Sequence, residues 1–442
     1  MKDSLFNHPR ADQLTGHLTP WLSSGLAFLL AAVPFHAFVV TVLGHEFGHQ
    51  LIIASWKEVL EFGIIAGVLV LGFFNHNWRW LQRGTNRAFL IAIGFGLLAS
   101  CLGQGFGVSW LAGVKTTVLP LVLFIAVQPL AEHFTDRRLA RLILIPALVV
   151  AGLAILQFLI VPTDFLTSVG YNGTTILPYQ GVHPGFDVAR AFSTLGGPNQ
   201  LGAYLILPTT WLLFRGLSEP LRQTRIISSI GFVTVLTGLA LSFSRSAILG
   251  LVTALIILFA LYVPVRWRWA VFVLTGLAGW LAWVFIMQIV SSSGTAWSSF
   301  FLRGSLLSTG IVGGDSGHVQ SILNGVQGII DHPLGLGLGS AGPASFFRPQ
   351  PNLTENWWLQ IAFELGIPGL LAILIGWVLM FKHWHTHLDH LDRILLAAMS
   401  GLAVSSLFLH TFGDSTLAII TLALAGLVYG RHWSSKSTEI QK

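Results

Sequence analysis

The chain has 442 residues and a formal net charge of +6, and 53% of its residues are hydrophobic while only 10% are charged. A soluble domain usually contains about a quarter charged residues, so this composition excludes an ordinary soluble protein. Apolar runs of about 20 residues, the length that crosses the hydrocarbon core of a bilayer, recur from residue 21 to residue 430. They do not alternate in polarity as barrel strands do. We therefore expect an all-α polytopic membrane protein with about twelve transmembrane helices.

The apolar runs divide the chain into two polar tails and one transmembrane domain. No small-residue cleavage site follows the first run, so we interpret residues 1–20 as a cytoplasmic tail rather than as a removed signal. Residues 21–430 form a single transmembrane domain, and residues 431–442 form a second cytoplasmic tail. The predicted spans are 21–43, 58–74, 88–106, 116–132, 140–161, 200–216, 225–243, 246–264, 269–290, 359–381, 394–411 and 415–430.

The basic residues indicate the orientation of this domain. With the N-terminus inside, 18 of the 24 Lys and Arg residues fall in cytoplasmic segments, as the positive-inside rule requires. Both termini are then cytoplasmic, and the two long connections, 162–198 and 291–358, are extracytoplasmic. The second is a large loop with a predicted helix, between the ninth and tenth spans. We expect the cytoplasmic (inner) membrane of a cell as the location, the lipid bilayer as a partner, and no nucleic acid partner.

Two of the arginines on the outer side, where positive charge is disfavoured, stand out. The basic residues on that side are Lys57, Lys115, Arg190, Arg245, Arg303 and Arg348. Arg190 precedes the sixth span, and Arg245 lies in the tight hairpin between the seventh and eighth spans. A guanidinium offers a fixed fork of donors to phosphate oxygens, so the pair suits a diphosphate. Contact with lipid headgroups, or pairing with Asp187 or Asp315, is the simpler explanation.

The loop 291–358 has an internal order of its own. Apolar residues at helical spacing predict a helix that begins at Asp315 or Ser316. The helix should end near Asp331, because Pro333 excludes the preceding residue from helical geometry. Three alternate glycines follow, and they suit either an anion-binding nest or, as we favour, a close-packed turn. They are Gly335, Gly337 and Gly339.

Two carboxylates mark the start of the tenth span. We expect Thr354 to cap this helix, which places Glu355 in its first turn, where the helix dipole favours a carboxylate whatever the function. The functional alternative is a general base at the membrane boundary. Glu364 lies deeper, where an ionisable group is either a functional candidate or a hydrogen-bonding contact between helices.

A short motif suggests a metalloprotease. His45, Glu46 and His49 match H-E-x-x-H, in which two histidines on one helical face hold zinc and the glutamate acts as base. No later Asp-Gly motif in an apolar segment supplies a third ligand. We therefore expect no metal at this motif and no cofactor for the protein.

Three blocks together resemble a known family. They are "RAFSTLGGPNQLGAYL", "LSFSRSAILGL" and "GIIDHPLGLGLGSAG…TENWWLQIAFELGIPGLL". In their order and spacing they resemble the O-antigen ligases and O-antigen polymerases of bacteria. That resemblance implies a GT-C-like membrane glycosyltransferase without a nucleotide-binding domain. Such enzymes take a glycan from undecaprenyl diphosphate and transfer it to a sugar hydroxyl of a saccharide or glycolipid acceptor.

The resemblance also assigns roles to residues in these blocks. By it, Arg190 and Arg245 match arginines that engage the diphosphate, and Asn199 matches a motif asparagine. Ser244 and Asn356 lie next to the key positions and are expected to support the site.

Two positions depart from the family pattern. Ligases have a histidine followed by asparagine where this chain has Glu355 and Asn356, and often an arginine where it has His318. The catalytic candidates, which would orient and deprotonate the acceptor, are therefore Glu355 and His318. The departures leave a polymerase at least as plausible as a ligase.

Two other classes of protein stay open. A transporter or flippase of lipid-linked saccharides would need polar groups at the bilayer midplane, whereas polar residues cluster on the outer side of this chain. An intramembrane zinc protease would follow from the H-E-x-x-H match.

Overall fold

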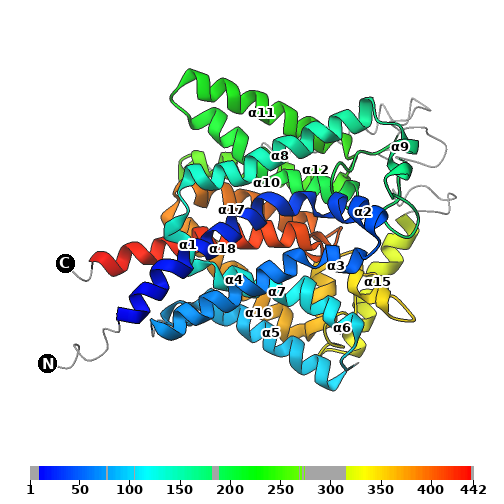
Figure 1. Cartoon of the computed structure of the whole chain (residues 1–442), viewed down its shortest axis with the longest axis horizontal. Coiled ribbons are helices and arrows are strands. Elements are labelled where there is room, and N and C mark those ends of the chain that lie inside the picture. Colours follow the sequence, from blue (N-terminus) through cyan, green and yellow to red (C-terminus); the bar gives the residue numbers. More distant parts are fainter. Residues whose placement is uncertain are drawn as a thin grey trace.

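The protein is built from helices that run roughly side by side along its longest axis (Figure 1). The computed structural model describes residues 9–439 except 76–77, 104, 182–188, 268, 271–272 and 274–314, and only the backbone of residues 9–15, 163–164, 265, 315–319 and 433–439. Within these limits it contains no strand, only one isolated bridge between Gly181 and Ala189.

The helices α1 to α9 are α1 (Pro9–Ala32), η1 (Val33–Phe35), α2 (His36–Phe47), α3 (Gln50–Ala54), α4 (Trp56–Phe74), η2 (Arg79–Gln82), α5 (Gly84–Leu102), α6 (Val108–Gly113), η3 (Val114–Val118), α7 (Leu119–Ala126), η4 (Gln128–His133), α8 (Asp136–Leu159) and α9 (Thr163–Ser168). The later helices are α10 (Pro198–Ser218), α11 (Arg222–Leu241), α12 (Arg245–Tyr262), η5 (Val265–Trp267), α15 (Asp315–Asp331), η6 (Pro343–Phe347), α16 (Trp357–His387), α17 (His390–Ser405), η7 (Thr411–Gly413) and α18 (Ser415–Glu439).

Eight helical segments among the described residues are long and apolar enough to cross a membrane. This confirms a helical, polytopic membrane protein, although not the predicted number of twelve spans. The predicted spans that correspond to α4, α10 and α17 do not meet the same criterion of length and composition. The predicted span 269–290 lies almost entirely outside the described residues.

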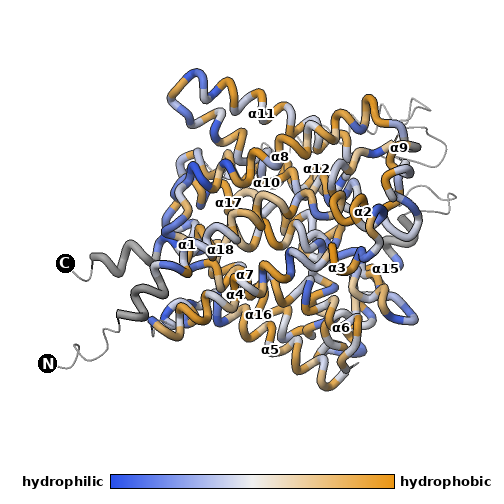
Figure 2. The backbone as a smooth tube through the Cα atoms, viewed as in Figure 1, coloured by the Kyte–Doolittle hydropathy of each residue, from blue (hydrophilic) through white to orange (hydrophobic). Residues whose placement is uncertain are grey.

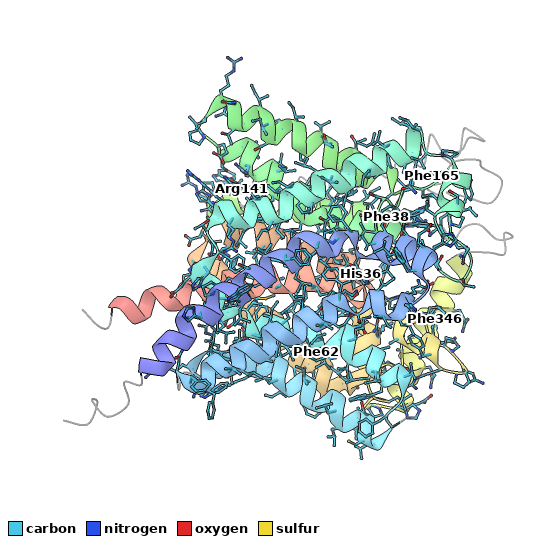
Figure 3. The ribbon with its side chains drawn as sticks, in the orientation of Figure 1. His36, Phe38, Phe62, Arg141, Phe165 and Phe346 are labelled. Carbon is cyan, nitrogen blue, oxygen red and sulfur yellow. The ribbon has the colours of Figure 1, made fainter. Side chains whose placement is uncertain are left out.

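The two ends of the bundle differ. Both chain ends lie at one end, which we call the terminal end, and α3, α9 and α15 lie at the other, which we call the loop end (Figure 1). Arg141 of α8 is near the terminal end and Phe165 of α9 is at the loop end (Figure 3). The two chain ends therefore lie at the same end of the bundle.

The outer surface of the bundle is apolar. Large hydrophobic side chains such as Phe62 and Ile230 are more than half exposed, and apolar residues follow the helices along their length (Figure 2). In water such a surface would be unfavourable, whereas lipid tails cover it at no cost. By contrast, nearly every described residue of α10 from Leu201 to Leu212 is buried, and α18 is similarly enclosed. These two helices form the centre of the bundle.

A non-helical segment from the predicted loop inserts against the broken helix α16. Gly366 interrupts α16 with φ 75°, ahead of Pro368. The segment satisfies its backbone there, because Leu336 N donates to Phe363 O at 2.9 Å and Gly337 N donates to Glu364 O at 3.0 Å. Such irregular backbone is tolerated at membrane depth only where protein surrounds it.

The glycines of this segment serve close packing. A Cβ at Gly337 would lie 2.6 Å from Ser100 Cα, and one at Gly339 would lie 1.9 Å from Ser109 O. Both glycines also have positive φ, which only glycine adopts at little cost. Because backbone amides of the segment are already bonded to Phe363, Glu364 and Ser100, it forms the close-packed turn that we favour rather than an anion-binding nest. The preceding helix α15 ends at Asp331, as predicted.

Candidate functional site

A cavity of about 950 Å³ lies at the loop end of the bundle. Four of the residues singled out from the sequence line it, although they are far apart in the chain. Three further ionisable residues join them in its wall. The predicted residues are Arg190, Asn199, Arg245 and Glu355, and the additional ones are Lys115, His410 and Asp414.

Four helices begin at the wall of this cavity. Asn199 and Arg245 lie in the first turns of α10 and α12, Glu355 directly precedes the cap of α16, and Ser415 begins α18. The first amides of a helix have no partner within the helix, and the helix dipole places positive partial charge at this end. Four such ends facing one space favour an anionic ligand.

Arg190 is held in place by its neighbours. Its Nε donates to Ser242 O at 2.9 Å, and one Nη donates to Asn199 Oδ1 at 2.7 Å. The motif asparagine therefore orients the arginine through a hydrogen bond. These contacts keep the planar guanidinium in one orientation at the cavity wall, which is the geometry that a phosphate needs.

The segment that follows Arg190 and leads into α10 is itself buried. Gln157 Oε1 accepts from the amides of Phe192 and Ser193, at 3.0 and 2.7 Å. Nearby, Tyr171 is fully buried, and burial raises the pKa of its phenol to about 12. The end of the loop 162–198 is thus packed into the bundle and gives Arg190 a rigid support.

Arg245 is the first residue of α12, and Ser244 caps that helix. Ser244 Oγ accepts from Ala247 N at 3.4 Å and is itself buried. Ser244 supports the site by fixing where the helix starts, and it does not line the cavity. The preceding residue, Phe243, has φ 47° and does line it, so the hairpin turns sharply at the site.

Glu355 has an unusual backbone conformation. Its φ is 50°, which costs a non-glycine residue about 1–2 kcal/mol. The expected cap, Thr354, is wrong: Asn356 caps α16, because its Oδ1 accepts from Leu359 N at 3.1 Å while its Nδ2 donates to Leu407 O at 3.0 Å. Glu355 therefore lies before the helix and not in its first turn. Strain of this kind persists only where the surrounding structure holds the backbone in place.

Lys115 and Thr116 reach the cavity from a π-helical turn, Val114–Val118. Such turns are rare and occur often at functional sites. Lys115 Nζ lies 2.6 Å from Glu58 Oε1, and the buried Lys57 lies 3.9 Å from the same oxygen. The π turn thus adds a third cation to the wall of the cavity and anchors it in an ion-pair network of α4.

His410 and Asp414 lie on the short connection between α17 and α18. Thr354 Oγ1 and His410 Nε2 are 3.3 Å apart, next to Glu355. Asp414 Oδ1 accepts from Leu417 N at 3.0 Å and so caps α18. Burial raises the pKa of the Asp414 carboxyl, and the Leu417 amide and the charge of Lys57 oppose this shift. One sequence signal was available for Asp414: it stands directly before Ser-Thr and an apolar run, as helix-capping residues do.

The remaining candidates lie elsewhere. Glu364 is fully buried and accepts from Thr117 Oγ1 at 3.0 Å and from Gln360 Nε2 at 3.2 Å, so it acts as a contact between helices and does not line the cavity. His318 is on α15, but its side chain is outside the described residues.

The H-E-x-x-H segment does not form one helical face. Helix α2 ends at Phe47, and the two residues that follow have positive φ, 76° at Gly48 and 28° at His49. His45 and His49 are therefore separated by a break in the helix, whereas the zinc motif needs both on one face. The segment lacks the geometry of a zinc protease.

The comparison with known families agrees with the sequence blocks. Residues 230–374 match the family model for O-antigen ligase. The matched region is about a third of the chain and includes Arg245 and Glu355, but not Arg190 and Asn199. No curated protein matches the chain. The resemblance to the superfamily of O-antigen ligases and polymerases is thus confirmed.

Proposed function

We propose that this helical membrane protein, which carries an O-antigen ligase segment, transfers a glycan from undecaprenyl diphosphate to a sugar hydroxyl on the outer face of the cytoplasmic membrane. The observation that carries the proposal is the meeting of Arg190, Arg245 and Glu355 in one cavity at the starts of four helices. The coarser conclusion, an O-antigen ligase-like membrane protein of polysaccharide assembly, follows from the family match.

The cationic wall of the cavity suits the diphosphate of the donor. In the reaction the bond between the anomeric carbon and the diphosphate oxygen breaks, and negative charge grows on the departing undecaprenyl diphosphate. Arg190, Arg245 and Lys115 supply positive charge for this leaving group, together with the helix N-termini. Arg190 can do so with little reorganisation, because Ser242 and Asn199 already hold it.

Glu355 suits the acceptor. The new bond forms between the acceptor oxygen and the anomeric carbon, and the hydroxyl proton passes to a base late in this step. We assign that role to the Glu355 carboxylate, with His410 as a neighbour able to accept or donate a hydrogen bond to the acceptor sugar. His318 stays the second candidate for the base. No metal is needed in this scheme, since the diphosphate is the activated leaving group.

The location of the buried charges favours an enzyme over a transporter. Among the described residues, the buried charged side chains of α4, Lys57 and Glu61, are within its first two turns, and Glu364 is two turns into α16. A transporter would present such groups at the bilayer midplane on several spans. In this protein these three are close to the end of the bundle that holds the cavity, and the buried Asp392 is in the first turn of α17.

The test is transfer in vitro from a defined undecaprenyl diphosphate glycan, with products identified by mass spectrometry. Arg245→Lys keeps the charge but loses the planar fork. It should cost about 2–4 kcal/mol of transition-state stabilisation, or about 30- to 1000-fold in rate. Arg222→Lys is the matched control, because Arg222 also begins a helix, α11, but does not line the cavity. Equal rates for both variants would contradict the assigned role of Arg245.

A further inference from the structure

Three histidines meet where α16 and α18 come together near the terminal end, away from the proposed glycosyl-transfer site. His383 and His387 are one turn apart on α16, and His432 is on α18. One ring nitrogen from each lies within 4.8 Å of the other two. Two histidines at this spacing share a helical face, as in known metal sites, and the third comes from a helix that is distant in sequence.

Hydrogen bonds select which ring nitrogens carry the lone pairs. His387 Nδ1 lies 2.8 Å from His383 O, and a carbonyl can only accept, so Nδ1 carries the proton and Nε2 the lone pair. His432 Nε2 lies 3.0 Å from Asp392, a carboxylate that also only accepts, so the lone pair of the neutral ring is on Nδ1. A histidine whose other nitrogen donates to a carbonyl or carboxylate is the usual arrangement of a metal ligand.

Two carboxylates lie beside His432. Asp392 is fully buried and bonds both His432 and the amide of Asp389, with 3.0 Å for each contact. Asp389 Oδ2 lies 3.9 Å from His432 Nδ1 and is mostly exposed. Asp392 thus acts as an orienting partner of His432, while Asp389 lies near His432 but is not grouped with His383 and His387. Their negative charges also offset the charge of a bound cation.

We propose that His383, His387 and His432 bind a divalent transition metal ion of the zinc type, with Asp392 as the orienting residue and a water molecule in the fourth position. Three imidazoles suit zinc, and they do not suit magnesium or calcium, which prefer oxygen ligands. The ion would tie the far ends of α16 and α18, two helices whose other ends begin at the cavity.

Metal binding to the full-length protein, purified through a tag without histidine, tests this proposal. We expect one Zn²⁺ per chain by titration calorimetry, and Co²⁺ should give the visible absorption of a tetrahedral site. Because His387 is exposed, His387→Ala should not disturb packing, and it should weaken binding by at least about 100-fold. Asp392→Asn should weaken it by about 10- to 100-fold, as a supporting residue does.

The controls separate this site from the other histidines of the chain. His385→Ala and His390→Ala remove neighbouring histidines that are not in the cluster and should leave affinity and stoichiometry unchanged. Zn²⁺ should also raise the unfolding temperature of the wild-type protein and of both controls, but not that of His387→Ala. The proposal is overturned if His387→Ala binds Zn²⁺ as tightly as His385→Ala, or if Co²⁺ gives only the weak spectrum of an octahedral ion.

Discussion

Glu355 is the residue at which backbone strain and proposed chemistry meet. If the carboxylate serves as the base, Glu355→Gln should fold normally and lose turnover, because the amide keeps the shape but cannot accept the proton. Glu355→Gly should also lose turnover, although it removes the cost of a positive φ. Glu355→Gly should change the free energy of unfolding by no more than about 1 kcal/mol. The change can have either sign, because relief of the strain stabilises the fold while the larger entropy loss of glycine on folding destabilises it.

The two variants are compared by turnover and by thermal unfolding in the same detergent. Asn356→Ala provides the contrast, because it removes the cap of α16 and should cost about 1 kcal/mol of stability. Normal turnover in a well-folded Glu355→Gln protein would exclude the catalytic role and leave His318 as the next candidate.

Asp414 should make stability depend on pH. Its folded-state pKa is raised above the ordinary value of 3.8, so the folded protein binds the proton more tightly than the unfolded chain. Stability from this group is therefore present at low pH and is lost as pH rises through the interval above 3.8. Asp414→Asn removes the titration and retains an acceptor for the Leu417 amide.

Unfolding temperatures of the wild type and Asp414→Asn, measured from about pH 4 to pH 8, provide the comparison. The wild type should lose stability relative to the variant as pH increases. The opposite trend would mean that the charges of Lys57 and the helix N-terminus outweigh burial.

At the level of elements, the glycine segment after Pro333 offers a way to separate two costs of replacing glycine by alanine. One is the steric clash of the new Cβ, and the other is the strain of a positive φ. Gly339 and Gly105 both have positive φ, 74° and 71°, but a Cβ at Gly105 would meet nothing within 4 Å. Gly105→Ala should therefore cost only the conformational strain, about 1–2 kcal/mol. Gly339→Ala should cost clearly more, because its Cβ would displace the backbone at Ser109.

Thermal unfolding of the two glycine variants tests this difference. Both must first be shown to insert in the membrane at wild-type levels. Equal losses of stability would indicate that the segment moves away from α6 without cost, and that its packing does not hold it in place.

Some elements could be predicted from sequence because the rule behind them is local. The end of α15 at Asp331 follows from Pro333 alone, and the apolar runs follow from the thickness of the bilayer. The cap of α16 was misassigned because "TEN" offers two capping side chains, and the choice between them depends on the contact of Asn356 with Leu407. That contact joins the start of α16 to the connection after α17, and no local pattern encodes it.

The candidate site shows the same limit. Arg190, Arg245 and Glu355 were identified because an outer arginine or a boundary carboxylate is conspicuous in the sequence. Lys115 was counted only as an outer basic residue, since nothing in its neighbours predicts a π turn. His410 was missed because a lone histidine in a short connection carries no signal until the cavity wall is known.

For the whole molecule, orientation in the membrane is the property that decides access to substrate. We predict that the loop end faces outward, from the distribution of the basic residues. In a Cys101→Ala background, Thr174→Cys at the loop end should react with an impermeant thiol reagent added to whole cells. Gln223→Cys, in the first turn of α11 at the terminal end, should react only after the membrane is permeabilised.

Both positions are exposed in the fold, so lack of reaction reports the membrane barrier and not burial. The reverse pattern, with Gln223→Cys labelled in intact cells, would invert the topology and place the cavity on the cytoplasmic side. That result would remove a lipid-linked donor of the outer leaflet from consideration.

The inserted segment after Pro333 also constrains how the protein is made. Its backbone partners include Phe363 and Glu364 of α16, which the ribosome delivers later, and Ser100 of α5, which is delivered much earlier. The segment therefore cannot form these backbone hydrogen bonds until α16 has been synthesised. Pro343 and Glu355, which line the cavity, follow this segment in the chain. The cavity is therefore completed late in biogenesis. A chain truncated before α16 would be inserted without it.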